Sequence, residues 1–140
     1  MTVMLRSEDF VGLWQLSRVI TDRLSDQAGT LLGTARFDSV GAGALAYEEA
    51  GKLRFGAAPE MEATRRYHWQ FGQDAVDVHF DNGAAFHSFV PCGHAQGTDH
   101  PCGDDFYQVR YDFTNWPVWQ ATWHVVGPRK DYVSVSRYWR

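Results

Sequence analysis

The chain has 140 residues, among them six Trp and six Tyr, and a formal net charge of −4. This length suits one domain, placed at residues 1–140, that forms a core without metal or disulfide support. The 13 basic residues are spread along the chain, so no nucleic-acid partner is predicted. No apolar run approaches the roughly 20 residues of a membrane-spanning helix, so no membrane partner is expected.

The N-terminus and the cysteines bear on location. Residues 1–10 lack a basic start followed by an apolar stretch, so they are not expected to act as a secretory signal. Two cysteines without such a signal favour the cytoplasm and free thiols. A bridge between Cys92 and Cys102 stays open as the alternative.

The first clear strand follows Phe10, which residues 7–9 are expected to carry as a plug on a short helical turn. Alternation then places four side chains on one face: Trp14, Leu16, Arg18 and Ile20. The arginine in this row has two interpretations. It is a rim residue whose charged end reaches water, or an interior cation that binds a ligand carboxylate or phosphate.

Three further segments alternate in the same way. Segment 31–40 places Ala35 and Phe37 inside, and segment 44–50 places Leu45, Tyr47 and Glu49 on one face. A turn is predicted at Gly51-Lys52, followed by a short strand over 53–56. Segment 63–72 has a mixed face of Arg65, Tyr67, Trp69 and Phe71. Arg65 is either a structural cation stacked on rings or a second ligand-binding arginine.

The pair Asn82-Gly83 predicts a tight hairpin between segments 77–81 and 84–90. A two-residue loop pairs Phe80 with Ala85, Val78 with His87 and Val76 with Phe89. Paired residues share a face, so His87 is predicted on the apolar, inward side. It is either a core histidine or a pocket residue.

Segment 91–104 holds both cysteines and two of the six histidines, His94 and His100. It is predicted to be a long loop between two strands, and long loops in compact domains are often functional. We therefore expect a lid in which His100, Cys102 and Asp105 close the mouth of a pocket.

The remaining strands complete an all-β fold. After the loop, Asp105, Tyr107, Val109 and Tyr111 share a face, and a later strand places Trp119, Ala121, Trp123 and Val125 together. The closing strand is 131–140. Consecutive hairpins predict a single antiparallel up-and-down barrel of about 8–10 strands, which has room for one small ligand.

Two resemblances support this fold. Phe10-x-Gly12-x-Trp14 on the first strand, with Arg137 on the last, resembles the calycin pattern of lipocalins and fatty-acid-binding proteins. That resemblance implies an arginine packed across the tryptophan, a structural role that falls here to Trp14 and Arg137. Almost the whole chain also resembles an uncharacterised bacterial family of calycin-like domains, through the motifs Phe10-x-Gly12-x-Trp14-x-x-x-Arg18, Tyr47-x-Glu49, Arg65-x-Tyr67-x-Trp69, Phe86-His87, His100-x-Cys102-x-x-Asp105-x-Tyr107 and Gly127-Pro128-Arg129-Lys130-x-Tyr132. This resemblance implies the fold and no activity.

The first functional hypothesis is a barrel that binds a small anionic or polar aromatic molecule without a cofactor. Aromatic walls with a few polar groups are typical of such sites. The predicted ligand-binding residues are Arg18, Tyr47, Glu49, Arg65, Tyr67, His87, His100, Cys102, Asp105 and Tyr107, with Tyr111 as a further candidate.

The second hypothesis is a small lyase, isomerase or hydrolase. His87 would act as general base, oriented by Asp105 or Glu49, and Tyr107 is the candidate that would donate to a developing oxyanion. The catalytic candidates are thus His87, Asp105 and Tyr107.

The third hypothesis is metal or haem binding through His87 or through the loop, whose His and Cys side chains are types that bind zinc or iron. The spacing Cys92-x-His94 and His100-x-Cys102 does not match a zinc knuckle, so no metal site is assigned. A homodimer contact through Trp116 and Trp139 is also possible.

Overall fold

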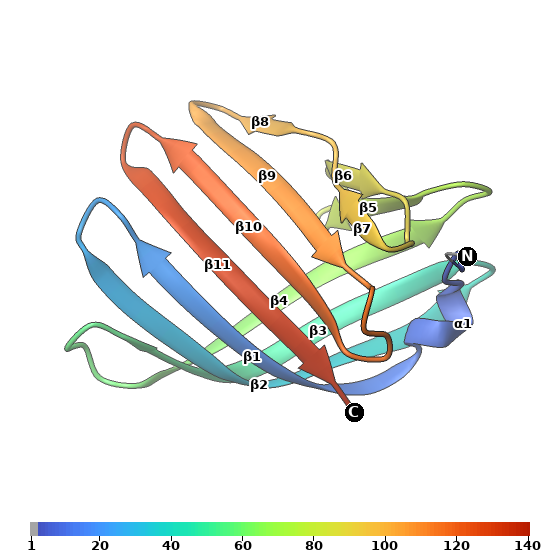
Figure 1. Cartoon of the computed structure of the whole chain (residues 1–140), viewed down its shortest axis with the longest axis horizontal. Coiled ribbons are helices and arrows are strands. Elements are labelled where there is room, and N and C mark those ends of the chain that lie inside the picture. Colours follow the sequence, from blue (N-terminus) through green and yellow to red (C-terminus); the bar gives the residue numbers. More distant parts are fainter. Residues whose placement is uncertain (1–2) are drawn as a thin grey trace.

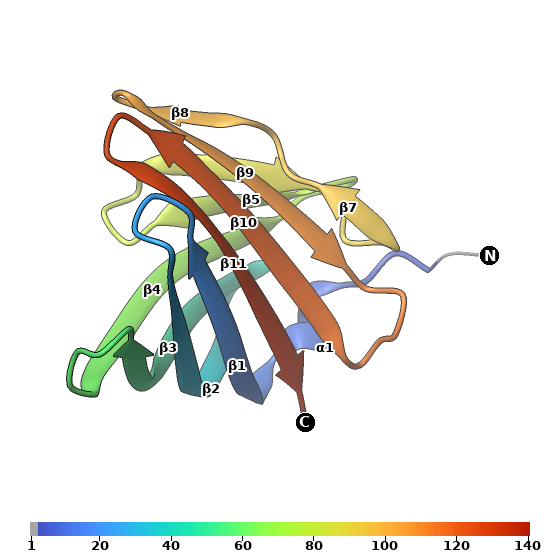
Figure 2. The same ribbon diagram turned by 60° about the vertical axis from the view of Figure 1, so that its left-hand side comes forward.

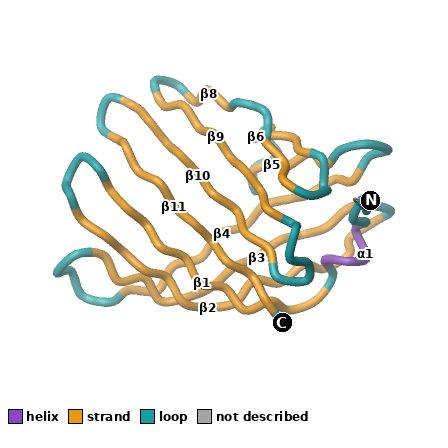
Figure 3. Tube along the Cα trace, in the orientation of Figure 1, coloured by secondary structure: helices purple, strands orange, loops and turns teal. Residues whose placement is uncertain are grey.

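A computed structural model describes residues 3–140 and places most of them in strands (Figure 3). One short helix, α1 (Ser7–Phe10), comes first. Eleven strands follow within the described range: β1 (Gly12–Asp22), β2 (Gln27–Gly41), β3 (Ala44–Phe55), β4 (Met61–Phe71), β5 (Val76–Phe80), β6 (Ala85–Phe89), β7 (His94–Gln96), β8 (His100–Cys102), β9 (Asp105–Asp112), β10 (Trp119–Gly127) and β11 (Lys130–Trp139).

The strands form one antiparallel sheet in the order β6-β5-β4-β3-β2-β1-β11-β10-β9-β7, with β8 also paired to β9. The sheet curls around one interior (Figures 1 and 2). Its edges meet where the Ser88 N–H donates to Thr98 Oγ1 and the Thr98 N–H donates to the Ser88 carbonyl, both at 2.9 Å. The predicted all-β, nearly closed antiparallel barrel with a short N-terminal helical turn is confirmed.

The two ends of the barrel differ. Helix α1 lies at one end, which we call the α1 end, and the β1–β2, β3–β4 and β10–β11 turns lie at the other, which we call the hairpin end (Figure 1). No helix within residues 3–140 is long and apolar enough to cross a membrane.

Segment 91–104 contributes two short strands to the sheet, β7 and β8, so the prediction of one long loop was wrong for residues 94–96 and 100–102. His94 of β7 pairs with Asp112, and His100 of β8 pairs with Tyr107. These two short strands satisfy backbone groups along the β9 edge that would otherwise be exposed. The segment therefore closes the seam between β9 and β6, and it raises the strand count above the predicted 8–10.

Strand β3 also differs from the prediction, because no turn interrupts it at Gly51-Lys52. Gly51 faces Gly33 of β2. A Cβ on Gly33 would overlap the Ala50 carbonyl oxygen, and one on Gly51 would lie 2.7 Å from the Leu32 carbonyl oxygen. Facing glycines thus allow the two long strands to approach closely and curve around the interior.

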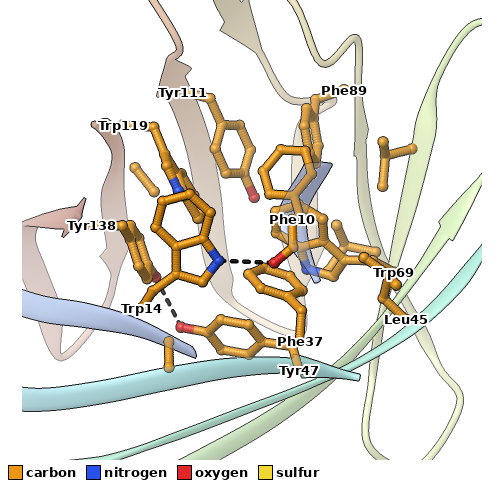
Figure 4. Close-up of a cluster of buried hydrophobic side chains, with 14 of the residues drawn as sticks. Phe10, Trp14, Phe37, Leu45, Tyr47, Trp69, Phe89, Tyr111, Trp119 and Tyr138 are labelled. Carbon is orange, nitrogen blue, oxygen red and sulfur yellow. Dashed lines mark hydrogen bonds between the residues drawn. The ribbon is translucent and has the colours of Figure 1, made fainter. Parts of the chain in front are cut away.

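Phe10 plugs the α1 end as predicted. It is fully buried, and its ring centroid lies 4.9 Å from that of Trp116 and 5.4 Å from that of Trp69. The Trp14 Nε1–H donates to the Phe10 carbonyl at 2.8 Å (Figure 4). Removing a buried Phe side chain costs about 3–5 kcal/mol, so this plug contributes much of the stability at this end.

The arginine expected across Trp14 is a different one. Arg140 Cζ lies 3.9 Å from the Trp14 ring centroid, whereas Arg137 lies over Trp139, 5.0 Å from that ring. Residue 137 is opposite Ser17 on β1 and is exposed, because its neighbour Tyr138 takes the inward position. The pairing of Trp14 with Arg137 was therefore wrong.

Candidate functional site

A buried ion pair lies on the inner face of the sheet and spans strand β2. Arg18 on β1 donates from both terminal nitrogens to Glu49 on β3, at 2.7 and 2.8 Å. Its Nε–H donates to Ser136 Oγ at 2.7 Å, and Ser136 is the residue directly opposite Arg18 in the β1–β11 register. Arg18 is 4% exposed and Glu49 2%. The interior cation is thus neutralised by a two-point carboxylate contact.

Two tyrosines extend this network. Tyr47 OH donates to Glu49 Oε1 at 2.7 Å and lies 2.9 Å from Tyr138 OH (Figure 4). Because Tyr47 has one proton, Tyr138 is the donor in the second bond. Burial favours a raised pKa for Glu49, but hydrogen bonds and charge from Arg18 outweigh it and lower that pKa. Burial raises the pKa of Tyr138 to about 12, so at neutral pH the carboxylate is charged and the phenol is protonated.

His87 is inside the barrel, opposite Val78 as predicted. The register then shifts, so that His79 faces Ala85 and Phe86 has no opposite residue. The predicted pairing of Phe80 with Ala85 was wrong because of this bulge. The bulge buries Phe86 as well as His87, and Phe86 stacks on Phe80 with ring centroids 4.5 Å apart.

The His87 ring has one hydrogen bond and one unpaired nitrogen. Nε2 lies 2.8 Å from Tyr111 OH, while Nδ1 is buried without a partner among residues 3–140. Burial, with a further contribution from the charge of His100, lowers the pKa of His87 to about 3. The ring is therefore neutral at pH 7, and Nδ1 is either a free donor or a free acceptor, depending on the tautomer.

These groups surround an internal cavity of about 30 Å³. The cavity is lined by the ion-pair network, by His87 and Tyr111, and by large rings from β4, β6 and β10, which include Tyr67, Trp69, Trp119 and Trp123. Trp119 Nε1 is also buried without a partner in the described residues. Since one water needs roughly 10–15 Å³ of such volume, the cavity has room for about two water molecules.

Comparison with protein families decides the kinship of this chain. Residues 10–140 match the model described as Family of unknown function (DUF6314). The chain belongs to the DUF6314 family. The expected kinship with a domain family of unknown function is thus confirmed, and no curated protein matches the sequence.

Two solved structures share the fold of this DUF6314 chain. One is a protein of unknown function from the DUF3598 family of Nostoc punctiforme PCC 73102, with a TM-score of 0.61 and 14% identity. The match covers 96% of this chain and 48% of the Nostoc chain, so the DUF6314 chain spans about half of that protein. The other is the S-type phycobiliprotein lyase CPES from Guillardia theta, with a TM-score of 0.66, 10% identity and coverage of 96% and 89%. At these identities the likeness shows the fold alone.

The DUF6314 structure brings about half of the predicted ligand-binding residues together. Those that line the cavity are Arg18, Tyr47, Glu49, Tyr67 and His87, with Tyr111. Outside the cavity, Arg65 and Tyr107 pack around Trp123, and His100 packs against Phe86 and Tyr107.

The remaining two predicted residues lie at the hairpin end. Asp105 forms an ion pair with Lys130 at 3.0 Å, and Cys102 is exposed at the β8–β9 turn. Neither Asp105 nor Glu49 is hydrogen-bonded to His87, whose Nε2 pairs with Tyr111 OH and whose Nδ1 has no partner among residues 3–140. The predicted orientation of a His87 base by one of these carboxylates was therefore wrong.

Sequence reasoning missed Ser136 and Tyr138, which complete the buried network. Ser136 ends the run Val133-Ser134-Val135-Ser136, where apolarity favours the valines as the inward residues, and Tyr138 follows two residues later. The serines are buried instead, because Arg18 requires a hydroxyl on that face. One signal in the sequence could have placed Ser136 inside: it lies two residues before the aromatic Tyr138 and therefore shares its face of the strand.

The metal hypothesis has a weak structural basis. Within residues 3–140, no three His, Cys, Asp or Glu side chains gather closely enough to hold a metal ion. Cys92 and Cys102 are both free thiols. Of the five residues considered as metal or haem ligands, only His87 lines the cavity.

Proposed function

We propose that the barrel binds a small polar aromatic molecule in its interior, between His87 and Trp119. The observation that carries this proposal is the pair of unpaired polar atoms, His87 Nδ1 and Trp119 Nε1, on residues that line one cavity. A buried polar group without a partner costs about 1–3 kcal/mol. A ligand that supplies an acceptor to the indole and a matching group to the imidazole recovers that cost.

The surroundings of the cavity favour a flat ligand without charge at its inner end. Tyr67, Phe86 and Trp123 present aromatic rings, which stack well on other rings. Arg18 is already neutralised by Glu49, so an anion placed deep in the cavity would gain little from it. Of the two predicted ligand classes, the polar aromatic one fits the inner cavity better.

Binding requires the cavity to widen, because sites for small molecules usually enclose about 300–1,000 Å³. Tyr67 and Trp123 are only half-buried and line the cavity, so they are the rings that we expect to move aside. The likeness to a phycobiliprotein lyase supports a barrel suited to ligands at the level of fold. Since the pKa of His87 is about 3, general-base catalysis at neutral pH is disfavoured.

The remaining expectations concern location and assembly. The free thiols Cys92 and Cys102 support a cytoplasmic location. The possible homodimer through Trp116 and Trp139, and the absence of a nucleic-acid partner, stay predictions.

A cavity-filling variant tests the proposed function. Ala121 is 4% exposed and lines the cavity, whereas its neighbour Gln120 is exposed. The probe is N-phenyl-1-naphthylamine, a neutral amine that joins a naphthalene to a phenyl ring and whose fluorescence rises in apolar sites. We expect wild type and Gln120→Phe to bind it and folded Ala121→Phe to lose binding. Equal binding by both variants would show that the dye does not occupy the interior.

A further inference from the structure

Arg65 lies at the rim of the cavity, on its hairpin-end side. It is half-buried on β4, opposite Glu49 on β3. Its Cζ lies 5.1 Å from the Trp123 ring centroid, and both Trp123 and Tyr67 line the cavity. The guanidinium therefore borders the rings that must move when a ligand enters.

This cation forms no close ion pair with another described residue, although its charge contributes to the lowered pKa of Glu49 opposite it. Among residues 3–140, the ion pairs include Arg18 with Glu49 and Lys130 with Asp105, and none includes Arg65. Its charge still reaches the site: burial raises the pKa of Tyr67, and Arg65 opposes that rise. The cavity thus has an ion pair that neutralises its inner end and, at its rim, an arginine without an ion-pair partner among residues 3–140.

We propose that Arg65 binds the acid group of the ligand, so that the ligand is an aromatic acid with its ring inside the barrel and its acid group at the rim. This inference rests on the proposed function and adds the ligand's charge and orientation. A guanidinium stacked by one face on an indole still has N–H groups along its edge. Those edges donate to a carboxylate or sulfonate through two parallel hydrogen bonds.

The competing explanation is structural, in which Arg65 only holds Trp123 in place through a cation–π contact. A structural arginine affects the binding of charged and neutral ring compounds equally. A ligand-binding arginine affects only the acid. The two roles are therefore separated by two dyes that differ in one acid group.

The experiment compares 8-anilino-1-naphthalenesulfonate with N-phenyl-1-naphthylamine, which has the same rings and no sulfonate. Fluorescence titrations give the Kd of each dye for wild type, Arg65→Met and Arg65→Lys. The control is Arg66→Met, since Arg66 is exposed on the other face of β4 and is ion-paired with Glu48 at 3.5 Å. Thermal melts confirm that each variant is folded.

We expect Arg65→Met to weaken binding of the sulfonate dye by about tenfold or more and binding of the neutral dye by less than about twofold, with an intermediate loss in Arg65→Lys. If both dyes weaken equally, or if the sulfonate dye is unaffected, the assignment is wrong while the proposed function stands. If neither dye binds wild type, the proposed function fails as well.

A measurement on the wild-type protein tests the same assignment even if an Arg65 variant fails to fold. A contact between Arg65 and an acid is screened by salt. The affinity for the sulfonate dye should therefore fall as salt rises, while that for the neutral dye does not. Equal salt dependence of the two dyes would also overturn the assignment.

Discussion

Arg18 on β1 and Glu49 on β3 form an ion pair over strand β2 through two N–O contacts of 2.7 and 2.8 Å, and neither residue is more than 4% exposed. The strand between them, β2, contributes no charge to this contact, so the two ions neutralise each other directly. This arrangement leaves the inner cavity neutral and leaves Arg65 at the rim as the cation available to a ligand.

Removal of one partner of this pair should strongly destabilise the protein. Glu49→Gln leaves the Arg18 charge buried without a counter-ion, and we expect it to lower the free energy of unfolding by about 3–5 kcal/mol. The double variant Arg18→Met with Glu49→Leu should recover most of that loss. Urea unfolding measures both. A loss below about 1 kcal/mol in the single variant would mean that water reaches the pair.

The stability of the fold should fall in mild acid because of His87. Its pKa is about 3 in the folded protein and 6.5 as the ordinary value, so between these values the unfolded chain binds the extra proton. Stability is therefore complete above pH 6.5 and is lost as pH falls. From pH 7 to pH 5 this one group costs about 2 kcal/mol.

The His87 effect is measured by urea unfolding at the two pH values. His87→Phe should lose less stability than wild type between pH 7 and pH 5, whereas the control His94→Gln changes an exposed histidine and should behave as wild type. A wild-type loss that persists fully in His87→Phe would assign the acid sensitivity to other groups.

Arg140 should stabilise the α1 end, and Arg137 should not. Arg140 stacks on Trp14 and donates to the carbonyls of Val11 and Asp9 at 2.9 and 2.8 Å. We expect Arg140→Met to cost about 1–2 kcal/mol and Arg137→Met less than about 0.5 kcal/mol. Thermal melts compare them. Equal effects would argue that the Trp14 contact contributes nothing.

Sequence patterns predicted the barrel and much of its interior, because alternation in long strands is a strong signal. Arg18, Glu49 and His87 each lie inside, where strand parity placed them. Strand alternation shows on which face a side chain lies, but it does not show how far that side chain extends or which residue it contacts. The same inward row that placed Arg18 inside does not reveal that its partner is Glu49, two strands away.

The predictions failed where the chain breaks its own alternation. The bulge at Phe86 shifts a hairpin that Asn82-Gly83 appeared to define, and a bulge leaves no signature in composition. Segment 91–104 has the Gly, Pro and polar composition that is typical of a loop. Two parts of it nevertheless pair with the free edge of β9 as short strands. Arg140 follows the last strand, so periodicity does not place it over Trp14.

The central claim is that a ligand occupies the interior and meets the Trp119 indole. Indole N–H resonances of ¹⁵N-labelled protein, assigned by Trp→Phe variants, report on this during titration with N-phenyl-1-naphthylamine. We predict that the Trp119 and Trp123 resonances shift while that of Trp139, beneath Arg137 on β11, does not. A titration that shifts Trp139 and leaves Trp119 unmoved would contradict an interior binding site.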